Sequence, residues 1–368
     1  LFEGQYDVPN GMSYNSYVIV DEKIAVFDTV DAAFNHQWMD NLQGALQGRA
    51  PDYLIVQHME PDHSANIHRF AEAYPDAVIV ATAKAFQMMA QFFGTDYADR
   101  RLVVGEGDTL SLGRHALTFV TAPMVHWPEV MATYDATDKV LFSADAFGKF
   151  GALDVEQDWA CEARRYYIGI VGKYGVNVQN VLKKASGLNI EVICPLHGPI
   201  LTENLAYYID LYDKWSSYTP EVKGVMLAYA SIYGNTELAA NILACRLREA
   251  GVPLVMYDTS VTDHSHILAE AFKYSHLVFA SPTYNGGAFS TMEHLLRDIA
   301  AHGLKNRKLA FLENGTWAAM ATKQMKAILE PLAGTEFIPK TLVIKSAIRQ
   351  NQKDELEALV AEIVESLK

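Results

Sequence analysis

The feature that most constrains this chain is a run of four polar side chains that comes directly after an apolar segment. Residues 53–56, Tyr-Leu-Ile-Val, are apolar and rich in β-forming types, which predicts a buried strand. The next seven residues contain His58, Glu60, Asp62 and His63. Imidazoles and carboxylates that leave a sheet edge together form a ligand mixture suited to iron, manganese or zinc. The run therefore predicts a metal site.

Pro61 determines the backbone that we expect for this run. A proline fixes its own φ and disfavours helix at the residue before it. We therefore expect His58, Glu60 and Asp62 to alternate along extended backbone. The competing interpretation is a solvated loop, because single His-x-Glu pairs are common on protein surfaces. Two further polar groups directly after the same strand make that interpretation the weaker one.

Three more candidate ligands repeat the same placement just past the end of a predicted strand. His126 follows residues 116–121, Asp145 follows residues 140–143, and His197 follows residues 191–195. One isolated histidine is more often structural than a ligand. Four strand ends with such side chains are typical of a metal site held rigidly by a sheet. We expect Cys194, on the last of these strands, to pack in the core.

Length and charge limit the domain count and the kinds of partner. A chain of 368 residues suggests two domains, and 50% hydrophobic with 20% charged residues is an ordinary globular balance. A formal net charge of -14 argues against nucleic acid or an anionic membrane as the main partner. No apolar run is long enough to cross a bilayer, and no leader pattern stands at the start, so we expect a cytoplasmic protein.

The three cysteines argue against a disulfide framework. They are odd in number and widely spaced, and no Cys-x-x-Cys occurs. The chain therefore carries no thiolate-bound iron centre of its own.

The first domain is expected to cover residues 1–218. Strands at 11–20 and 24–28 read as a hairpin, and the remaining strands besides those above are expected at 77–81 and 102–104. Helices are expected at 32–46, 67–74, 84–93 and 205–211. The stretch 213–220, with its serines and proline, is expected to be the domain boundary.

The second domain, expected at 221–368, has a strict alternation of strand and helix. Its predicted strands are 225–230, 253–257, 277–280, 309–312 and 341–344. Its predicted helices are 237–250, 264–274, 289–302, 319–332 and 354–367. Five strands that alternate with helices indicate a doubly wound, five-stranded parallel sheet.

The first strand of this domain leads into a candidate phosphate loop. The loop consists of Ser231, Ile232, Tyr233, Gly234, Asn235 and Thr236 and runs into a helix. Hydroxyls, an amide and a helix N-terminus offer hydrogen-bond donors and a positive dipole end to one phosphate. The absence of a Walker lysine and of GxGxxG disfavours nucleoside triphosphates and dinucleotides, so a mononucleotide fits better. An ordinary helix cap is the competing interpretation.

The phosphate loop resembles that of flavodoxins, which holds the phosphate of FMN. Two further loops after strands agree with that resemblance, which implies that they pass along the isoalloxazine ring. They consist of Pro282, Thr283, Tyr284, Asn285, Gly286, Gly287 and of Asn314, Gly315, Thr316, Trp317. Trp317 is the expected stacking partner of the ring, and a packing role in its loop is the alternative.

The first domain resembles the metallo-β-lactamase fold, an αβ/βα sandwich whose pattern is His-x-His-x-Asp-His followed by His, Asp and His at strand ends. Here Glu60 stands in place of the second histidine. That substitution, together with His-Trp-Pro at 126–128, Asp-x-Phe-Gly at 145–148 and His-Gly-Pro at 197–199, resembles the flavodiiron proteins, also called A-type flavoproteins. The resemblance covers both halves of the chain, with no appended module. A carboxylate in place of an imidazole also favours a metal that reaches the ferric state.

The resemblance implies two non-haem iron ions and FMN in each subunit. His58, Glu60 and His126 would bind one iron, Asp62, His63 and His197 the other, and Asp145 would bridge them. His63 is the least firmly assigned, because its equivalent in the family can swing away from the metal. The expected activity is the reduction of O2 to water, of NO to N2O, or of both.

The resemblance also implies partners. Electrons would arrive from a separate rubredoxin-type carrier, for which we expect docking near Trp317. A head-to-tail homodimer, or a tetramer built from it, would bring the flavin of one subunit to the irons of the other. Two alternatives stay open: a zinc hydrolase of the same fold with a flavin-binding regulatory domain, and a flavodoxin-type electron carrier with a vestigial first domain.

Overall fold

The computed structural model describes residues 1–368 and divides the chain into two compact units, Leu1–Asp213 and Lys214–Lys368, called unit 1 and unit 2 below. Unit 1 contains two five-stranded sheets. The first has the order β1 (Tyr17–Val20), β2 (Ile24–Phe27), β3 (Tyr53–Ile55), β4 (Val78–Ala81), β5 (Arg101–Val103). The second has the order β10 (Val192–Cys194), β9 (Val140–Phe142), β8 (Met131–Asp135), β7 (Ala116–Thr121), β6 (Thr109–Ser111).

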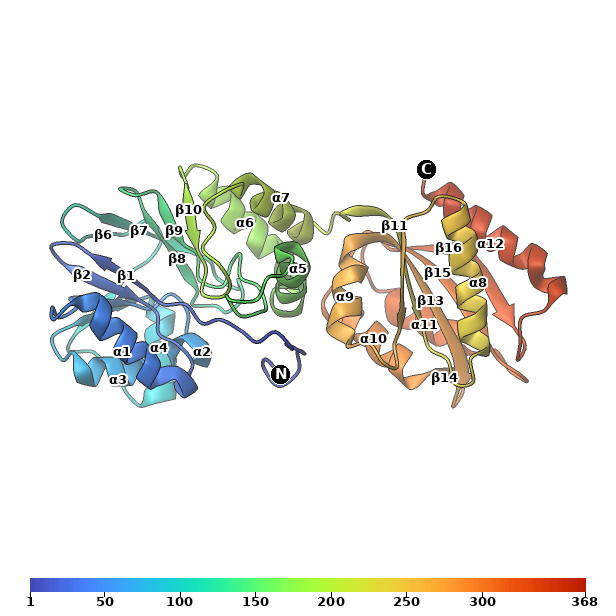
Figure 1. The fold of residues 1–368 in the computed structure, drawn as a ribbon, viewed down its shortest axis with the longest axis horizontal. Helices are drawn as coiled ribbons and strands as arrows, with labels where there is room; N and C mark the ends of the chain where they lie inside the picture. Colours follow the sequence, from blue (N-terminus) through green and yellow to red (C-terminus); the bar gives the residue numbers. More distant parts are fainter. The chain divides into compact units, whose positions relative to one another are not determined.

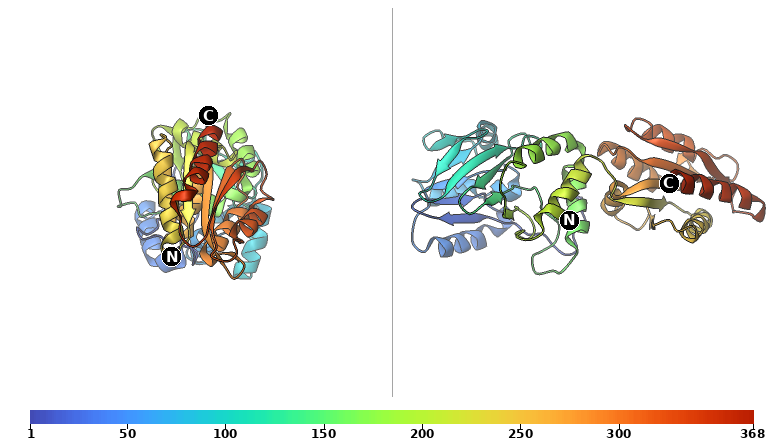
Figure 2. Two further views of the ribbon diagram at one scale, coloured as in Figure 1. Left: turned by 90° about the vertical axis from the view of Figure 1, so that its right-hand side faces the viewer. Right: turned by 90° about the horizontal axis from the view of Figure 1, so that it is seen from above.

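The helices of unit 1 fall into two groups along the chain. Those of the first half are η1 (Ala32–Phe34), α1 (Asn35–Leu46), α2 (Pro61–Ser64), α3 (Ile67–Ala73) and α4 (Ala83–Phe93). Those of the second half are α5 (Trp159–Ile170), η2 (Gly172–Tyr174), α6 (Gly175–Ala185) and α7 (Leu205–Ser216). Figure 1 shows α1 and α3 on the outer side of the β1–β2 sheet, and Figure 2 shows the same layers from above.

The alternation of side chains along each strand places the first sheet between two hydrophobic cores. Ile24 and Val26 of β2 pack against residues of α1, α3 and α4, among them Leu42. Ala25 and Phe27 of the same strand face the second sheet, and Phe27 stacks on Phe142 of β9 at 4.0 Å between ring centroids. Because side chains alternate with a period of two, each strand serves both cores. The αβ/βα sandwich predicted from the sequence is confirmed.

One difference from the expected elements concerns the metal-site candidates themselves. Asp62 and His63 lie on the helical turn α2, with Pro61 as its first residue, so the prediction that Asp62 continues an extended backbone is wrong. Glu60, the N-cap, has the expected extended conformation (φ -59°, ψ 138°). Proline disfavours helix before it but is well placed at the first position of a helix, and the helix begins there.

The first expected strand, 11–20, is shorter in the structure, since β1 covers only Tyr17–Val20. The preceding residues cross between the two sheets. The Asn15 N–H donates to the Leu196 carbonyl (2.8 Å), and the Ser16 hydroxyl donates to the carbonyls of Phe27 and Asp28. Strands β6 and β8 and helices α5 and α6 were not among the expected elements.

Unit 2 is a parallel sheet with helices on both faces. Its strand order is β12 (Leu254–Asp258), β11 (Val222–Tyr229), β13 (Tyr274–Tyr284), β15 (Lys308–Asn314), β16 (Glu336–Ile344), and the two-residue β14 (Gly287–Ala288) pairs antiparallel with the end of β13. The helices are α8 (Asn235–Glu249), α9 (His264–Lys273), α10 (Ser290–Ala301), α11 (Ala321–Leu329), η3 (Gln350–Gln352) and α12 (Lys353–Ser366). The predicted doubly wound, five-stranded parallel sheet is confirmed.

The core of unit 2 explains which helices cover which face. Val225 and Leu227 of β11 pack with Leu243 of α8 and Leu359 of α12. Figure 1 accordingly shows α8 and α12 on one side of the sheet and α9 and α10 on the other. None of the helices in the structure combines the length and the hydropathy that a transmembrane span requires.

Candidate metal centre and flavin-binding loops

The seven ligand candidates lie together in unit 1, in two groups of donor atoms. The donor atoms within each group are no more than 4.8 Å apart. One group consists of His58, Glu60, His126 and Asp145, and the other of Asp62, His63 and His197. They follow the ends of β3, β7, β9 and β10, so the two sheets supply both groups from their edges. No candidate predicted from the sequence is left outside.

In the first group, four side chains converge on one point. The Nε2 atoms of His58 and His126 are 3.1 Å apart, and Glu60 Oε2 lies 3.1 Å from His126 Nε2 and 3.3 Å from His58 Nε2. Asp145 Oδ2 is 3.2 Å from His126 Nε2 and 3.4 Å from His58 Nε2. Both histidines and Asp145 are buried, while Glu60 keeps partial exposure.

The second group has the same composition. The Nε2 atoms of His63 and His197 are 3.0 Å apart, and Asp62 Oδ2 lies 3.3 Å from the first and 3.2 Å from the second. Asp145 Oδ1 is 3.0 Å from His63 Nε2 and 3.8 Å from His197 Nε2. The ring of His63 thus points into the group. Asp145 presents one carboxylate oxygen to each group and so connects them.

The donor sets fit two metal ions. Ligands about 2.0–2.2 Å from a shared ion, at tetrahedral to octahedral angles, are about 2.8–3.6 Å apart. All but one of the separations given above fall in that range; the exception is the 3.8 Å between His197 and Asp145. Asp62 Oδ1 and Oδ2 and Asp145 Oδ1 are also buried without a hydrogen-bond partner. A buried carboxylate without partners is costly, and a cation between the donors removes that cost.

Burial and mutual attraction both act on the pKa values here. Burial by itself would lower the pKa of His63, but Asp62 and Asp145 outweigh it and raise that pKa to about 9. Burial would likewise raise the pKa of Asp145, but His63 and His58 hold it well below its usual range. The carboxylates that attract protons to these rings attract a divalent cation in the same way.

A buried carboxylate that the sequence did not single out orients His58. Glu129 Oε1 lies 2.8 Å from His58 Nδ1 and accepts a hydrogen bond from the Met59 N–H (2.9 Å). Glu129 is only 1% exposed. A partner on the second ring nitrogen fixes the ring and its tautomer, as in many metal sites. The only signal in the sequence is its position three residues after His126.

Hydrogen bonds from other parts of the chain also position His197 and the loop that follows β3. His197 Nδ1 donates to the Ser13 carbonyl at 2.7 Å, and the Gly198 N–H donates to the Ser13 hydroxyl at 2.7 Å. Asp28 accepts hydrogen bonds from the backbone N–H groups of Gln57 and His58. Ser13, which precedes β1, therefore holds the loop of His197, and Asp28, which follows β2, holds the loop of His58.

Aromatic rings and the first residues of the chain surround the donor groups. Phe2, Tyr14 and Tyr166 each pack edge-on against His197, with centroids 5.4–5.7 Å apart. Trp127 packs edge-on against His58 at 5.3 Å. Burial and a hydrogen bond with Glu60 raise the pKa of Glu3 to about 7. The rings restrict water around the donors, which strengthens electrostatic attraction there.

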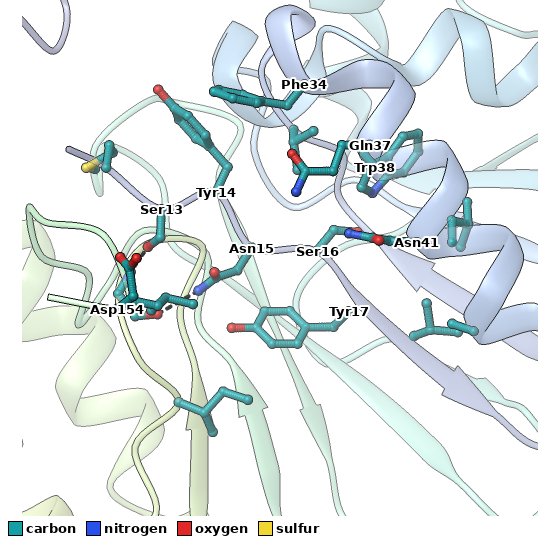
Figure 3. A pocket seen from close by; sticks show the side chains of 18 residues that line it. Ser13, Tyr14, Asn15, Ser16, Tyr17, Phe34, Gln37, Trp38, Asn41 and Asp154 are labelled. Atoms are coloured by element: carbon teal, nitrogen blue, oxygen red, sulfur yellow. Dashed lines mark hydrogen bonds between the residues drawn. The ribbon is translucent and has the colours of Figure 1, made fainter.

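A groove of about 780 Å³ lies beside the second donor group but contains none of its side chains. Figure 3 shows Tyr14, Asn15 and Tyr17 on one of its walls and Gln37 and Asn41 of α1 on another. Asn15 is already occupied, because its side-chain amide donates to the carbonyls of Pro195 and Gly198. The groove contacts the donor group through Ser13, Tyr14 and Gly198.

The candidate phosphate loop of unit 2 has a conformation suited to an anion. It connects β11 to α8, and Gly234 is the N-cap of α8 with φ +85°, a conformation that favours glycine. The Ser231 hydroxyl accepts hydrogen bonds from the N–H groups of Gly234 (3.1 Å) and Glu237 (3.3 Å). The loop therefore lies at the N-terminus of α8, where the positive end of the helix dipole favours an anion.

The two other loops lie at the ends of neighbouring strands of the same sheet. Residues 283–288 form a hairpin between β13 and β14 with Asn285 and Gly286 at positive φ, as an Asn-Gly turn requires. Asn314 connects the third loop to its neighbours, since its amide donates to the Thr236 hydroxyl (3.3 Å) and the Ser346 carbonyl (2.9 Å). Ser346, on the loop after β16, was not predicted.

Two aromatic rings at these loops are almost fully exposed. Trp317 is 94% exposed and Tyr233 is 91% exposed. Large exposed rings are unusual on a folded surface, and they commonly contact a ligand or partner. Trp317 is on the third loop, one of the two loops that the sequence predicts to flank a flavin, whereas Tyr233 is on the predicted phosphate loop.

Comparisons with known proteins agree with this geometry. Residues 12–198 match the family model described as ODP family beta lactamase, and residues 227–361 match flavodoxin. The nitric oxide reductase of Moorella thermoacetica is 30% identical, over 91% of this chain and 88% of that protein. The structure of rubredoxin oxygen:oxidoreductase from Desulfovibrio gigas has a TM-score of 0.92 at 27% identity, covering 100% of this chain and 93% of that one. For the flavodiiron protein from Giardia intestinalis the TM-score is 0.91 at 25% identity, covering 99% and 90%.

A β-lactamase-like sandwich with donors for two metal ions, followed by a flavodoxin-like sheet, defines a class of metal-containing two-domain flavoproteins. Within that class, the chain belongs to the flavodiiron protein family. FMN and a pair of non-haem irons are the cofactors of this family. The family, fold and cofactors predicted from the sequence are thus confirmed.

Proposed function

We propose that this protein is an oxidoreductase that reduces O2 to water, NO to N2O, or both, at a diiron centre held by the seven residues described above. The observation that carries the proposal is the matched pair of donor groups connected through the two oxygens of Asp145. Each group offers two imidazoles, one carboxylate of its own and one oxygen of Asp145. Two like sites that share one carboxylate suit two ions that act together on one small molecule.

The similar proteins support this reaction class. One of them is named a nitric oxide reductase and another a rubredoxin oxygen:oxidoreductase. We therefore keep both gases as substrates and a rubredoxin-type protein as electron donor. The reduction of O2 to two water molecules consumes four electrons and four protons. The conversion of two NO molecules to N2O and water consumes two of each.

The protein's own side chains have distinct tasks in this proposal. When bound, the iron pair supplies electrons to the small oxidant, and FMN replaces them. Glu60 contributes negative charge and oxygen ligation, which favours the ferric state over a purely imidazole-bound ion. Glu129 and the Ser13 carbonyl hold His58 and His197 by their second ring nitrogens. Phe2, Tyr166 and Trp127 restrict water around the ligands.

The flavin loops have their own division of roles. The phosphate loop and the start of α8 bind the phosphate of FMN through backbone N–H groups and the helix dipole. The loops at 282–287 and 314–317 flank the ring. Trp317 and Tyr233 provide exposed aromatic faces for stacking.

The test is the anaerobic, fully reduced protein mixed with each gas in a stopped-flow instrument. We expect flavin reoxidation with at least one gas, together with O2 consumption or N2O formation, and two irons per chain by metal analysis. The Glu106→Gln variant, which removes an exposed carboxylate that pairs with Lys184 and belongs to neither donor group, should behave like the wild type. Two zinc ions per chain and no reoxidation by either gas would instead support a hydrolase.

We also propose the head-to-tail homodimer expected from the sequence, with a tetramer as its larger form. Sedimentation at decreasing protein concentration, with activity measured in parallel, tests it. Activity should fall as monomer forms. Full activity in a purely monomeric sample contradicts the proposal.

A further inference from the structure

A second cluster of imidazole and carboxylate groups lies in unit 2 and includes none of the flavin-loop residues. His264 is the first residue of α9, and His294 and Asp298 are on α10. One ligand atom of each residue lies within 4.8 Å of the others. The cluster is therefore compact enough to be compared with the metal centre of unit 1.

Local geometry brings the three side chains together. His294 and Asp298 are four residues apart on α10, so they lie on the same face of that helix. The two helices pack against each other on one face of the sheet, as Figure 1 shows. The rings of His264 and His294 are 4.6 Å apart between centroids and inclined by 60°. Any group that binds all three residues would cross-link α9 to α10.

No side chain outside the cluster is hydrogen-bonded to or ion-paired with its imidazole and carboxylate atoms. His264 Nδ1 is shielded from solvent and has no hydrogen-bond partner among the side chains. The backbone of Thr259 interacts with the ring and leaves the other ring nitrogen available to an ion. The adjacent Arg297 is paired with Glu293 at 2.7 Å, which leaves Asp298 without a cationic partner.

The other cluster of this kind in the chain is different. In unit 1, His115 Nδ1 is bound to Asp135 Oδ2 at 2.8 Å, and the guanidinium of Arg114 donates to its Nε2 at 3.0 Å. Both ring nitrogens are therefore occupied, and the nearby positive charge repels a cation. The contrast indicates that proximity of histidine and aspartate alone does not make a site, whereas the cluster on α9 and α10 has free donors.

We propose that His264, His294 and Asp298 bind one divalent transition-metal ion of the Zn²⁺ type, independently of the iron pair. Two imidazoles and one carboxylate suit borderline ions such as Zn²⁺, whereas Ca²⁺ and Mg²⁺ prefer oxygen ligands throughout. Three protein ligands leave further positions for water. Because His294 is exposed, the ion can enter directly from solvent.

The bound ion would cross-link α9 and α10, and α10 follows one of the predicted flavin loops directly in the sequence. α10 begins at Ser290, directly after the hairpin of residues 283–288, and α9 follows β12. An ion that binds only the folded arrangement stabilises it in proportion to the logarithm of its free concentration. Zinc should therefore raise the thermal midpoint of unit 2.

The experiment uses the full chain loaded with iron and FMN, dialysed against graded concentrations of Zn²⁺. Zinc and iron per chain are then counted by mass spectrometry. We expect one zinc per chain with iron retained. His294→Ala should weaken zinc binding at least tenfold, and its exposed position should preserve the fold. His36→Ala, which removes an exposed histidine of α1, is the matched control and should bind zinc like the wild type.

Spectroscopy of the bound ion provides a second readout. With Cu²⁺ in place of zinc, the electron paramagnetic resonance spectrum should show coupling to two imidazole nitrogens in the wild type and to one in His294→Ala. Three results overturn the proposal: zinc uptake matched by iron loss, equal zinc binding in His294→Ala, or no zinc binding by the iron-loaded chain.

Discussion

His58 Nδ1 lies 2.8 Å from Oε1 of the buried Glu129, while Nε2 of the same ring faces the other donors of its group. Glu129→Gln keeps the shape of the side chain but removes its charge. We expect iron to bind about 10–100-fold more weakly at the first site, because the ligand loses the partner that orients it and raises its basicity. Competition with a coloured iron chelator measures this. Unchanged affinity would show that Glu129 only packs against the loop.

Asp145 and Asp62 differ in how many donor groups they face, and this difference can be tested. Asp145 offers an oxygen to each donor group, whereas Asp62 faces only His63 and His197. Asp145→Asn should therefore weaken both ions and abolish the magnetic coupling between them. Asp62→Asn should mainly affect one.

Iron counting and Mössbauer spectroscopy of the two variants, prepared side by side, distinguish these outcomes. Equal losses in the two variants contradict a bridging role for Asp145. Asp154→Asn, a change at the wall of the groove beside the second donor group, is the control and should retain both irons.

The metal-site candidates could be predicted because their signal is local. Each follows a short apolar strand. In the second sheet β7, β9 and β10 run in the same direction, so the residues that follow them lie at one edge. Glu129 could not be found in this way. A glutamate just after Trp127 and Pro128 reads as a surface residue, and only the folded structure shows that it is 1% exposed and bound to His58.

The missed elements have a physical reason as well. β8, Met-Ala-Thr-Tyr-Asp, is buried at every position, so it has no alternation of apolar and polar residues. α5 buries both Arg164 and Arg165 along with its apolar residues, which removes the usual amphipathic stripe. The strict alternation of unit 2 was easier to predict, because its strands form continuous apolar runs between helices.

Trp317 allows a test of the flavin site. Its ring is 94% exposed, and we propose that it stacks on the flavin. Trp317→Ala should weaken FMN binding about 2–10-fold, since an aromatic pair contributes about 0.5–1.5 kcal/mol beyond burial. Trp317→Phe should keep most of the affinity. Titration of the flavin-free protein, followed by quenching of FMN fluorescence, gives both values. Equal affinity of the alanine variant and the wild type would place the ring elsewhere.

The lowered pKa of the buried His276 leads to a prediction of how the stability of unit 2 depends on pH. It is buried and hydrogen-bonded to Ser275 and Ser366, and burial, with Lys308 next in importance, lowers its pKa to about 4. The unfolded chain, with a histidine pKa of about 6.5, binds more protons between these two values. The free energy of unfolding should therefore fall as pH decreases from about 6.5 towards 4, by at most about 1.4 kcal/mol per pH unit. His276→Gln, which cannot gain a proton, should reduce this dependence in urea unfolding at pH 7 and pH 5. An equally steep dependence in the variant would assign it to other groups.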